Sequence, residues 1–303
     1  MPEPTPLIDR LAPSLRSPSL EGVKDAATVS VLDALSAPQF SQWVGRLAQA
    51  KLPKPLLTAA IRRFIAIFDV DMSEMGAPIE SYDSFDAFFT RALKTTAHPV
   101  DPEPGVAVSP VDARVMSWGT VSDGLIQQVK GKDYRLDELL DSATDARRYA
   151  HGGFITLYLS PRDYHRIHCP VDGAIVGYRY VPGRLYPVNG LGLKHVERLF
   201  AVNERLISFL DSKDFGEVAV VKVGATNVGM ITASYHPIRT NAGQRTAYDE
   251  RFKRKIPISR AAELGQFHLG STVVLVWSSP NARLVEVKRD QMFRMGQRLL
   301  TAR

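Results

Sequence analysis

The hydrophobic repeat of this 303-residue chain changes part-way along its length, and that change limits the folds open to it. Over about the first 100 residues, apolar side chains recur every three or four positions, which is the spacing of one helix face. From about Val106, short runs of β-branched and aromatic residues alternate with Gly, Pro and Asp, a pattern typical of β-strands. We therefore predict an α+β fold, in which a helical region over residues 1–100 precedes a β-rich, barrel-like catalytic body over residues 101–303.

The N-terminal region is expected to hold three amphipathic helices, at residues 40–47, 55–69 and 85–93. Pro53 separates the first two, because proline interrupts a helix, and Ser84 is a suitable N-cap for the third. Such helices either pack on a protein core or lie in a membrane interface, with aromatic side chains down and Arg at the headgroups. The sequence leaves both interpretations open for residues 40–68.

The charge balance favours an anionic partner. There are 38 Lys and Arg against 32 Asp and Glu, a net charge of +6, which suits either nucleic acid or an acidic lipid surface. The densest basic cluster, residues 251–255, lacks the repeated basic and aromatic pattern of nucleic-acid binders, so we expect no nucleic-acid partner.

No apolar stretch approaches the roughly 18 residues of a membrane-spanning helix, so membrane contact is expected to be peripheral. The first ten residues, MPEPTPLIDR, lack the basic start and apolar run of a secretory signal.

The β-rich body is expected to contain strands at residues 154–159, 174–181, 217–223, 228–235, 272–277 and 283–288, with short helices near 136–140 and 193–206. Two similar turns, Pro110-Val111-Asp112 and Pro170-Val171-Asp172, each lead into an apolar strand. Turns of this kind are common at strand starts, but the repetition also suits a duplicated β unit. The single cysteine, Cys169, excludes an internal disulfide and a cysteine-rich zinc site.

Two histidines, His165 and His168, lie in a segment that directly follows a predicted strand, where functional residues concentrate. Two His three positions apart could ligate a metal, but neither a third ligand nor the helical signature of zinc enzymes accompanies them, so we expect no metal. They are either structural histidines or an acid and a base that act near neutral pH.

Ser271 follows Gly270 at the start of another predicted strand, and Asp112 lies in the first of the two turns. Each has an ordinary explanation as a turn residue. Together, however, Asp112, His168 and Ser271 supply a nucleophile relay, in which a carboxylate orients the His that takes the proton of the Ser hydroxyl. A serine hydrolase acting on a lipid or an ester would use the same three side chains.

These segments resemble bacterial phosphatidylserine decarboxylase. Leu-Gly-Ser-Thr at residues 269–272 resembles the self-cleavage motif of that family, and residues 158–168 resemble its long histidine motif almost residue for residue. Further similar segments are residues 82–93, 180–183, 200–205, 223–229 and 295–297. The resemblance covers about residues 60–300, with two departures: Ala113 follows Asp112 where the family usually has Gly, and His268 stands where many relatives have Lys.

The resemblance implies a proenzyme that cleaves itself between Gly270 and Ser271, giving a β chain of residues 1–270 and an α chain of residues 271–303 that stay together. Ser271 would become a covalent pyruvoyl group, the pyruvate cofactor on which the substrate amine forms a Schiff base. Decarboxylation leaves negative charge on the α-carbon, and such a carbonyl accepts it, as pyridoxal phosphate does in other enzymes. By resemblance, Asp112 and His168 activate Ser271 for cleavage, and His165 serves the decarboxylation step.

The implied enzyme is a lyase of phospholipid biosynthesis that converts phosphatidylserine into phosphatidylethanolamine and carbon dioxide. Its expected partners are the phosphatidylserine substrate, an anionic membrane surface and a second copy of the chain in a homodimer. We expect it to lie peripherally on the cytoplasmic side of the cell membrane.

Overall fold

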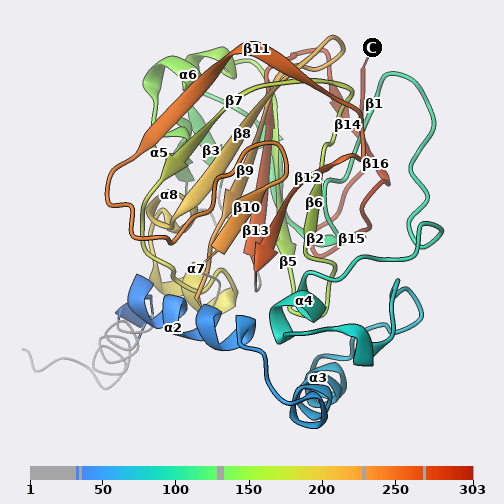
Figure 1. Ribbon diagram of the computed structural model, residues 1–303. Coiled ribbons are helices and arrows are strands. Elements are labelled where there is room, and N and C mark those ends of the chain that lie inside the picture. The colour runs from blue at the N-terminus through green and yellow to red at the C-terminus, as the bar shows by residue number, and fades with distance from the viewer. Residues whose placement is uncertain (1–31, 34–35, 128–132, 227–229, 269–270, 303) are drawn as a thin grey trace, which may run out of the picture.

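The computed structural model describes residues 32–33, 36–127, 133–226, 230–268 and 271–302, in which helices precede a strand-rich body (Figure 1). The early helical elements are α2 (Pro38–Gln49), α3 (Lys54–Phe68), the 3-10 helix Ile79–Ser81 and α4 (Phe85–Phe89). The first described strand, β1, is Val106–Val108. The expected mixture of helices and strands, with strands dominating, is confirmed; the functional division at residue 100 stays a prediction.

An antiparallel eight-stranded sheet forms the centre of the body, in the order β11-β7-β8-β9-β13-β5-β2-β15. Its strands are β2 (Ala113–Thr120), β5 (Gly153–Leu159), β7 (Gly173–Val181), β8 (Arg205–Ser212), β9 (Gly216–Val223), β11 (Tyr248–Ile258), β13 (Ser271–Trp277) and β15 (Met292–Phe293). The side chains of β13 are buried on both faces: Val273 and Leu275 face one core, and Val274 and Val276 the other. A central strand is apolar throughout when both faces of its sheet are covered.

Short helices cover one face of the sheet, and two small sheets cover the other. The helices are α5 (Leu136–Leu140), α6 (Ala143–Arg148), α7 (Gly190–His195) and α8 (Leu199–Val202). The small sheets are β1-β16-β14 and β10-β12-β6, built from β6 (Arg166–His168), β10 (Met230–Ala233), β12 (Glu263–His268), β14 (Arg283–Leu284) and β16 (Arg298–Thr301). A separate hairpin joins β3 (Leu125–Gln127) to β4 (Asp133–Arg135). The barrel-like body is not confirmed, because the strands in the described ranges close no barrel and β11 and β15 remain sheet edges.

The N-terminal helices gather at one end of the central sheet (Figure 1). Leu57 and Ile61 of α3 are buried with Phe88 of α4 in a small apolar cluster. The N-cap predicted for α4 is confirmed, since Ser84 Oγ accepts a hydrogen bond from Ala87 N at 3.1 Å. Among the helices that the structure describes, none is both long enough and apolar enough to cross a bilayer.

The helix expected near residues 193–206 is confirmed only in part. The chain forms α7 and α8 there, and β8 begins at Arg205. Leu199 and Leu206 recur at helical spacing, but Leu199 packs in the helical layer and Leu206 faces the opposite core from within β8. Of the strand expected at 228–235, the first two positions lie outside the described residues and the strand ends early, at Ala233; the strand expected at 283–288 is shorter than predicted, at Arg283–Leu284.

The two similar turns lie side by side and contact each other. Val108 N donates to Pro170 O at 2.9 Å, and His168 N donates to Pro110 O at 2.8 Å. Each turn follows a three-residue strand and precedes a long strand of the central sheet. The two turns therefore occupy equivalent places relative to the central sheet; a duplicated β unit stays a prediction.

Candidate active site

Three neighbouring strands bring the predicted site segments to one end of the sheet. β13 begins at Ser271, which pairs with Leu159 at the end of β5. Arg114 of β2 pairs with Tyr158, so the turn that holds Asp112 lies at this same end. Gly270 and the side chain of Ser271 lie outside the described residues. The sheet register therefore places the backbone of Ser271 close to the start of the histidine segment.

His165 is fully buried and presents an unoccupied nitrogen. Its ring lies against Phe89 of α4, with 4.1 Å between ring centroids. Nδ1 lies 2.7 Å from Asp163 O, and because a carbonyl only accepts, the proton is on Nδ1 and the lone pair on Nε2. Nε2 is buried with no hydrogen-bond partner among the described residues. Burial lowers the pKa of His165 to about 3, so the ring is neutral at physiological pH.

His168 is half-buried and also neutral, but both of its ring nitrogens have hydrogen-bond partners. Nδ1 donates to Ala261 O at 2.7 Å, and Nε2 accepts from the Tyr164 hydroxyl at 3.0 Å. Burial lowers the pKa of this imidazole. His168 pairs with Glu263 on β12, whereas His165 O accepts from Phe267 N at 3.0 Å. Along β12, His165 thus lies nearer to the cleavage segment than His168.

Asp112 is buried in a polar cluster that the sequence did not reveal. Its Oδ1 accepts from Met295 N at 2.8 Å and lies 3.3 Å from His98 Nδ1, while His98 Nε2 lies 3.3 Å from Glu74 Oε2. Burial raises the pKa of Asp112 to about 6, and the neighbouring His98 opposes that rise most strongly.

The predicted direct contact between Asp112 and His168 is not observed in the described part of the chain. Asp112 faces His98 and Met295, while Ala261 O occupies Nδ1 of His168 and the Tyr164 hydroxyl occupies Nε2. Asp112 and Tyr164 do line one cavity of about 270 Å³.

Glu74, His98 and Asp112 offer potential metal-ligand atoms within 4.8 Å of one another. The two carboxylates approach different ring nitrogens of His98, each at 3.3 Å. A single ion takes one nitrogen from a histidine and needs the carboxylates on that same side. We therefore interpret the cluster as an electrostatic one, in which His98 hydrogen-bonds to Glu74 and lies close to Asp112.

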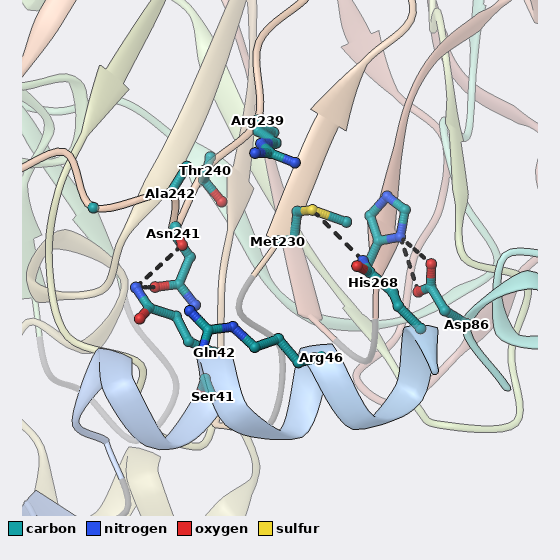
Figure 2. Close-up of a pocket in the computed structure, with 13 residues that line it drawn as sticks. Ser41, Gln42, Arg46, Asp86, Met230, Arg239, Thr240, Asn241, Ala242 and His268 are labelled. Atoms are coloured by element: carbon teal, nitrogen blue, oxygen red, sulfur yellow. Dashed lines mark hydrogen bonds and ion pairs between the residues drawn. The ribbon is translucent and has the colours of Figure 1, made fainter. Parts of the chain in front are cut away.

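A second pocket lies beside α2 (Figure 2). It has a volume of about 400 Å³ and lies between α2 and the loop at residues 239–243. His268, the last described residue before Gly270, lines it and is held by Asp86 of α4. His268 Nδ1 lies 2.9 Å from both Asp86 carboxylate oxygens, and its Nε2 lies 3.2 Å from Thr232 Oγ1.

The comparisons with known proteins agree with the motifs that meet at this site. A family model described as "Phosphatidylserine decarboxylase" matches residues 85–301, which include Asp112, both histidines and the Gly270-Ser271 pair. The chain belongs to the phosphatidylserine decarboxylase family. The resemblance drawn from the motifs is thereby confirmed.

Similar members of the phosphatidylserine decarboxylase family come from diverse bacteria. A phosphatidylserine decarboxylase proenzyme of Myxococcus xanthus is 40% identical over 278 residues, covering 91% of this chain and 99% of that protein. The proenzyme of Brevibacillus brevis is 43% identical over 249 residues, covering 82% of this chain and 89% of its own length. That of Azotobacter vinelandii is 41% identical, with coverages of 85% and 90%.

Sequence reasoning missed His98, Glu74 and the Tyr164 hydrogen bond. Tyr164 lies inside the histidine motif, so the motif was itself a signal for it. His98 and Glu74 are separated from each other and from Asp112 in the sequence, and no local pattern connects them. Only the fold brings these three side chains together.

Proposed function

We propose that this chain is the proenzyme of a pyruvoyl-dependent phosphatidylserine decarboxylase, a carboxy-lyase that forms phosphatidylethanolamine and carbon dioxide. The observation that carries this proposal is the family match over residues 85–301, which contains the complete set of predicted site residues. The relatives are named proenzymes, which supports a chain that is activated by cleavage. The serine hydrolase alternative gains no support from these names.

Self-cleavage would begin when the Ser271 hydroxyl attacks the carbonyl carbon of Gly270 and His168 takes the hydroxyl proton. The peptide C–N bond breaks and an ester forms; loss of the Ser271 α-proton then expels the Gly270 carboxylate and leaves dehydroalanine. Hydrolysis of dehydroalanine releases ammonia and yields the pyruvoyl group. His168 suits the role of base, because its neutral ring has its lone pair on Nε2. Ser271 must displace the Tyr164 hydroxyl from that nitrogen.

Asp112 would stabilise the positive charge that His168 acquires when it takes the proton. Asp112 and Tyr164 line the same cavity. Burial is the main cause that raises the pKa of Tyr164 to about 12, and the charge of Asp112 adds to that rise. Because Asp112 acts across Tyr164, we assign it a positioning and electrostatic role. Only its ionised form provides that charge.

The residues beside the start of β13 fit a cofactor derived from Ser271. His165 Nε2 and Thr272 Oγ1 are both buried without hydrogen-bond partners in the described ranges, and such orphaned atoms are costly unless a further group meets them. The pyruvoyl group, when formed, supplies the carbonyl that withdraws electrons from the substrate's α-carbon. The lone pair on Nε2 of His165 would first take up a proton from solvent and then pass it to that carbon, and Phe89 packs against the ring.

The membrane contact would come from α2 and α3, with the chain acting as a homodimer on the cytoplasmic face of the cell membrane. α3 does pack inward through Leu57 and Ile61, but both helices also expose large apolar side chains. These are Trp43, Leu47, Leu56, Ile67 and Phe68. Exposed apolar residues beside Arg and Lys suit a helix in a membrane interface. The homodimer and the cytoplasmic face come from the family resemblance.

Incubation of the purified protein with phosphatidylserine labelled at the serine carboxyl tests this function. We expect labelled carbon dioxide and phosphatidylethanolamine, and borohydride added with substrate should trap an adduct on the fragment that begins at residue 271. Release of fatty acid or free serine without carbon dioxide would instead indicate a hydrolase and refute the proposal.

A further inference from the structure

The pocket between α2 and the loop at residues 239–243 presents two guanidinium groups without an acidic partner. Arg46 extends from α2, and Arg239 lies on the facing segment, on the opposite side of the pocket (Figure 2). Neither has a hydrogen bond or an ion pair within the described ranges of the chain. Asp86 is the one carboxylate among the thirteen lining residues, and His268 already holds it. The pocket is therefore built for an anion.

A buried hydroxyl gives this pocket a further donor. Ser41 lines the pocket, is fully buried, and its Oγ has no hydrogen-bond partner in the described part of the chain. A buried hydroxyl without a partner costs folding free energy unless a ligand or a water satisfies it. Ser41 therefore adds a neutral donor beside the two cations.

The pocket is fixed in shape by contacts across it. Gln42 Nε2 donates to Asn241 Oδ1 at 3.0 Å and to Asn241 O at 3.2 Å, which ties α2 to the facing loop. His268 and Asp86 tie β12 to α4 at the other end. A preformed site loses less conformational entropy when its ligand binds.

We propose that this pocket binds the phosphodiester of the phospholipid headgroup, with Arg46 and Arg239 as its cationic contacts and Ser41 as a donor. This inference rests on the proposed function. His268 lines the pocket and stands three positions before Ser271. In phosphatidylserine, only one oxygen and one methylene separate the phosphorus from the α-carbon that reacts, so a phosphate bound here keeps that carbon beside the cleavage segment.

The reaction itself favours the phosphodiester over the substrate carboxylate as the ligand of the two cations. The carboxylate loses its charge as carbon dioxide leaves, so cations that held it would stabilise the ground state more than the transition state. The phosphodiester keeps its charge throughout and provides uniform binding. Arg46 and Arg239 are thus expected to affect KM and to leave kcat nearly unchanged.

The surface of α2 agrees with this geometry. Gln42 and Arg46 are four residues apart and face the pocket, whereas Trp43 and Leu47 are also four apart and are 62% and 53% exposed. If the exposed pair meets the apolar edge of a membrane, the pocket side of the helix lies level with the headgroups. One helix would then provide both membrane contact and headgroup binding.

The test compares Arg46→Gln, Arg239→Gln and their double variant with the wild-type protein, with Arg254→Gln on the distant edge strand β11 as the matched control. Each single change should raise KM for phosphatidylserine in phosphatidylcholine vesicles by about tenfold, the effect of one charge-assisted hydrogen bond. Self-cleavage and kcat should stay close to wild type, and Arg46→Lys should recover part of the affinity. An unchanged KM in the double variant, or a fall in kcat alone, would overturn the proposal.

A second measurement separates the headgroup from free phosphate and from the membrane. Glycerophosphoethanolamine, the soluble product headgroup, should inhibit the wild-type enzyme competitively and about tenfold less strongly in each variant. Inorganic phosphate inhibiting as strongly would contradict a headgroup site. A headgroup site would also be contradicted if the Arg46 and Arg239 variants lost vesicle binding but were still inhibited by glycerophosphoethanolamine as strongly as the wild type. Wild-type protein that is cleaved but releases no carbon dioxide would refute the proposed function. Variants with unchanged KM and unchanged inhibition would refute only the headgroup site.

Discussion

The pH dependence of self-cleavage should follow the ionisation of Asp112. Burial raises the pKa of this carboxyl from 3.8 to about 6, and we propose that its charge stabilises protonated His168. With a pKa of about 6, roughly one-tenth of Asp112 is ionised at pH 5 and about nine-tenths at pH 7. Cleavage should therefore be about tenfold slower at pH 5 than at pH 7. A carboxyl with an ordinary pKa would be ionised at both values, and the rate would barely change.

The assay follows newly synthesised, radiolabelled proenzyme after transfer into buffers between pH 5 and pH 7.5, with the two-chain fraction measured on denaturing gels. The folded-state pKa is raised, so the ionised form required for cleavage is lost as the pH falls through 6. The charge of His98 lowers the pKa of Asp112, so His98→Gln should move the midpoint to higher pH. Asp112→Asn should cleave slowly at every pH. A wild-type rate that is constant from pH 5 to pH 7 would refute the role given to Asp112.

Three further variants test the histidine, the membrane face and the helical cluster. His165→Ala should still be cleaved but should decarboxylate about 10²–10⁴-fold more slowly, and a fully active variant would contradict its role in proton delivery. Replacing Trp43 and Leu47 with Ser should weaken co-sedimentation with anionic vesicles by at least about tenfold, whereas undiminished sedimentation would place the membrane contact elsewhere. Phe88→Ala should lower the free energy of unfolding by about 3–5 kcal/mol in a denaturant titration, because Phe88 is fully buried, while the exposed Val100→Ala should change it by no more than about 0.5 kcal/mol.

Local sequence patterns predicted the elements whose periodicity is undisturbed. The helical apolar pattern at residues 55–69 corresponds to α3, and the apolar runs at 154–159 and 272–277 correspond to β5 and β13. The strand β8 was missed, because nearly all of its side chains are buried on one face or the other, which removes the alternation that marks a strand. The edge strand β11 was missed because it is rich in charge and its register shifts between Arg251 and Ile256.

The site could be predicted only where its residues share a motif. His165, His168 and Ser271 stand in recognisable segments, and the sheet register brings those segments to one end. The partners of Asp112 could not be predicted, because His98 and Glu74 come from separate loops that meet it only in the folded chain. The anion pocket likewise combines α2 with a loop almost two hundred positions away, joined by the Gln42–Asn241 contact. Contacts between distant segments depend on packing, which no local pattern encodes.

Intact mass under denaturing conditions shows whether the backbone is cut at Ser271 to make the cofactor. The wild-type protein should give two chains, residues 1–270 and a fragment of residues 271–303 that begins with a pyruvoyl group in place of Ser271. Ser271→Ala should give one inactive chain close to 33.5 kDa. A single intact wild-type chain that is active, or normal cleavage of Ser271→Ala, would show that Ser271 is not the source of the cofactor.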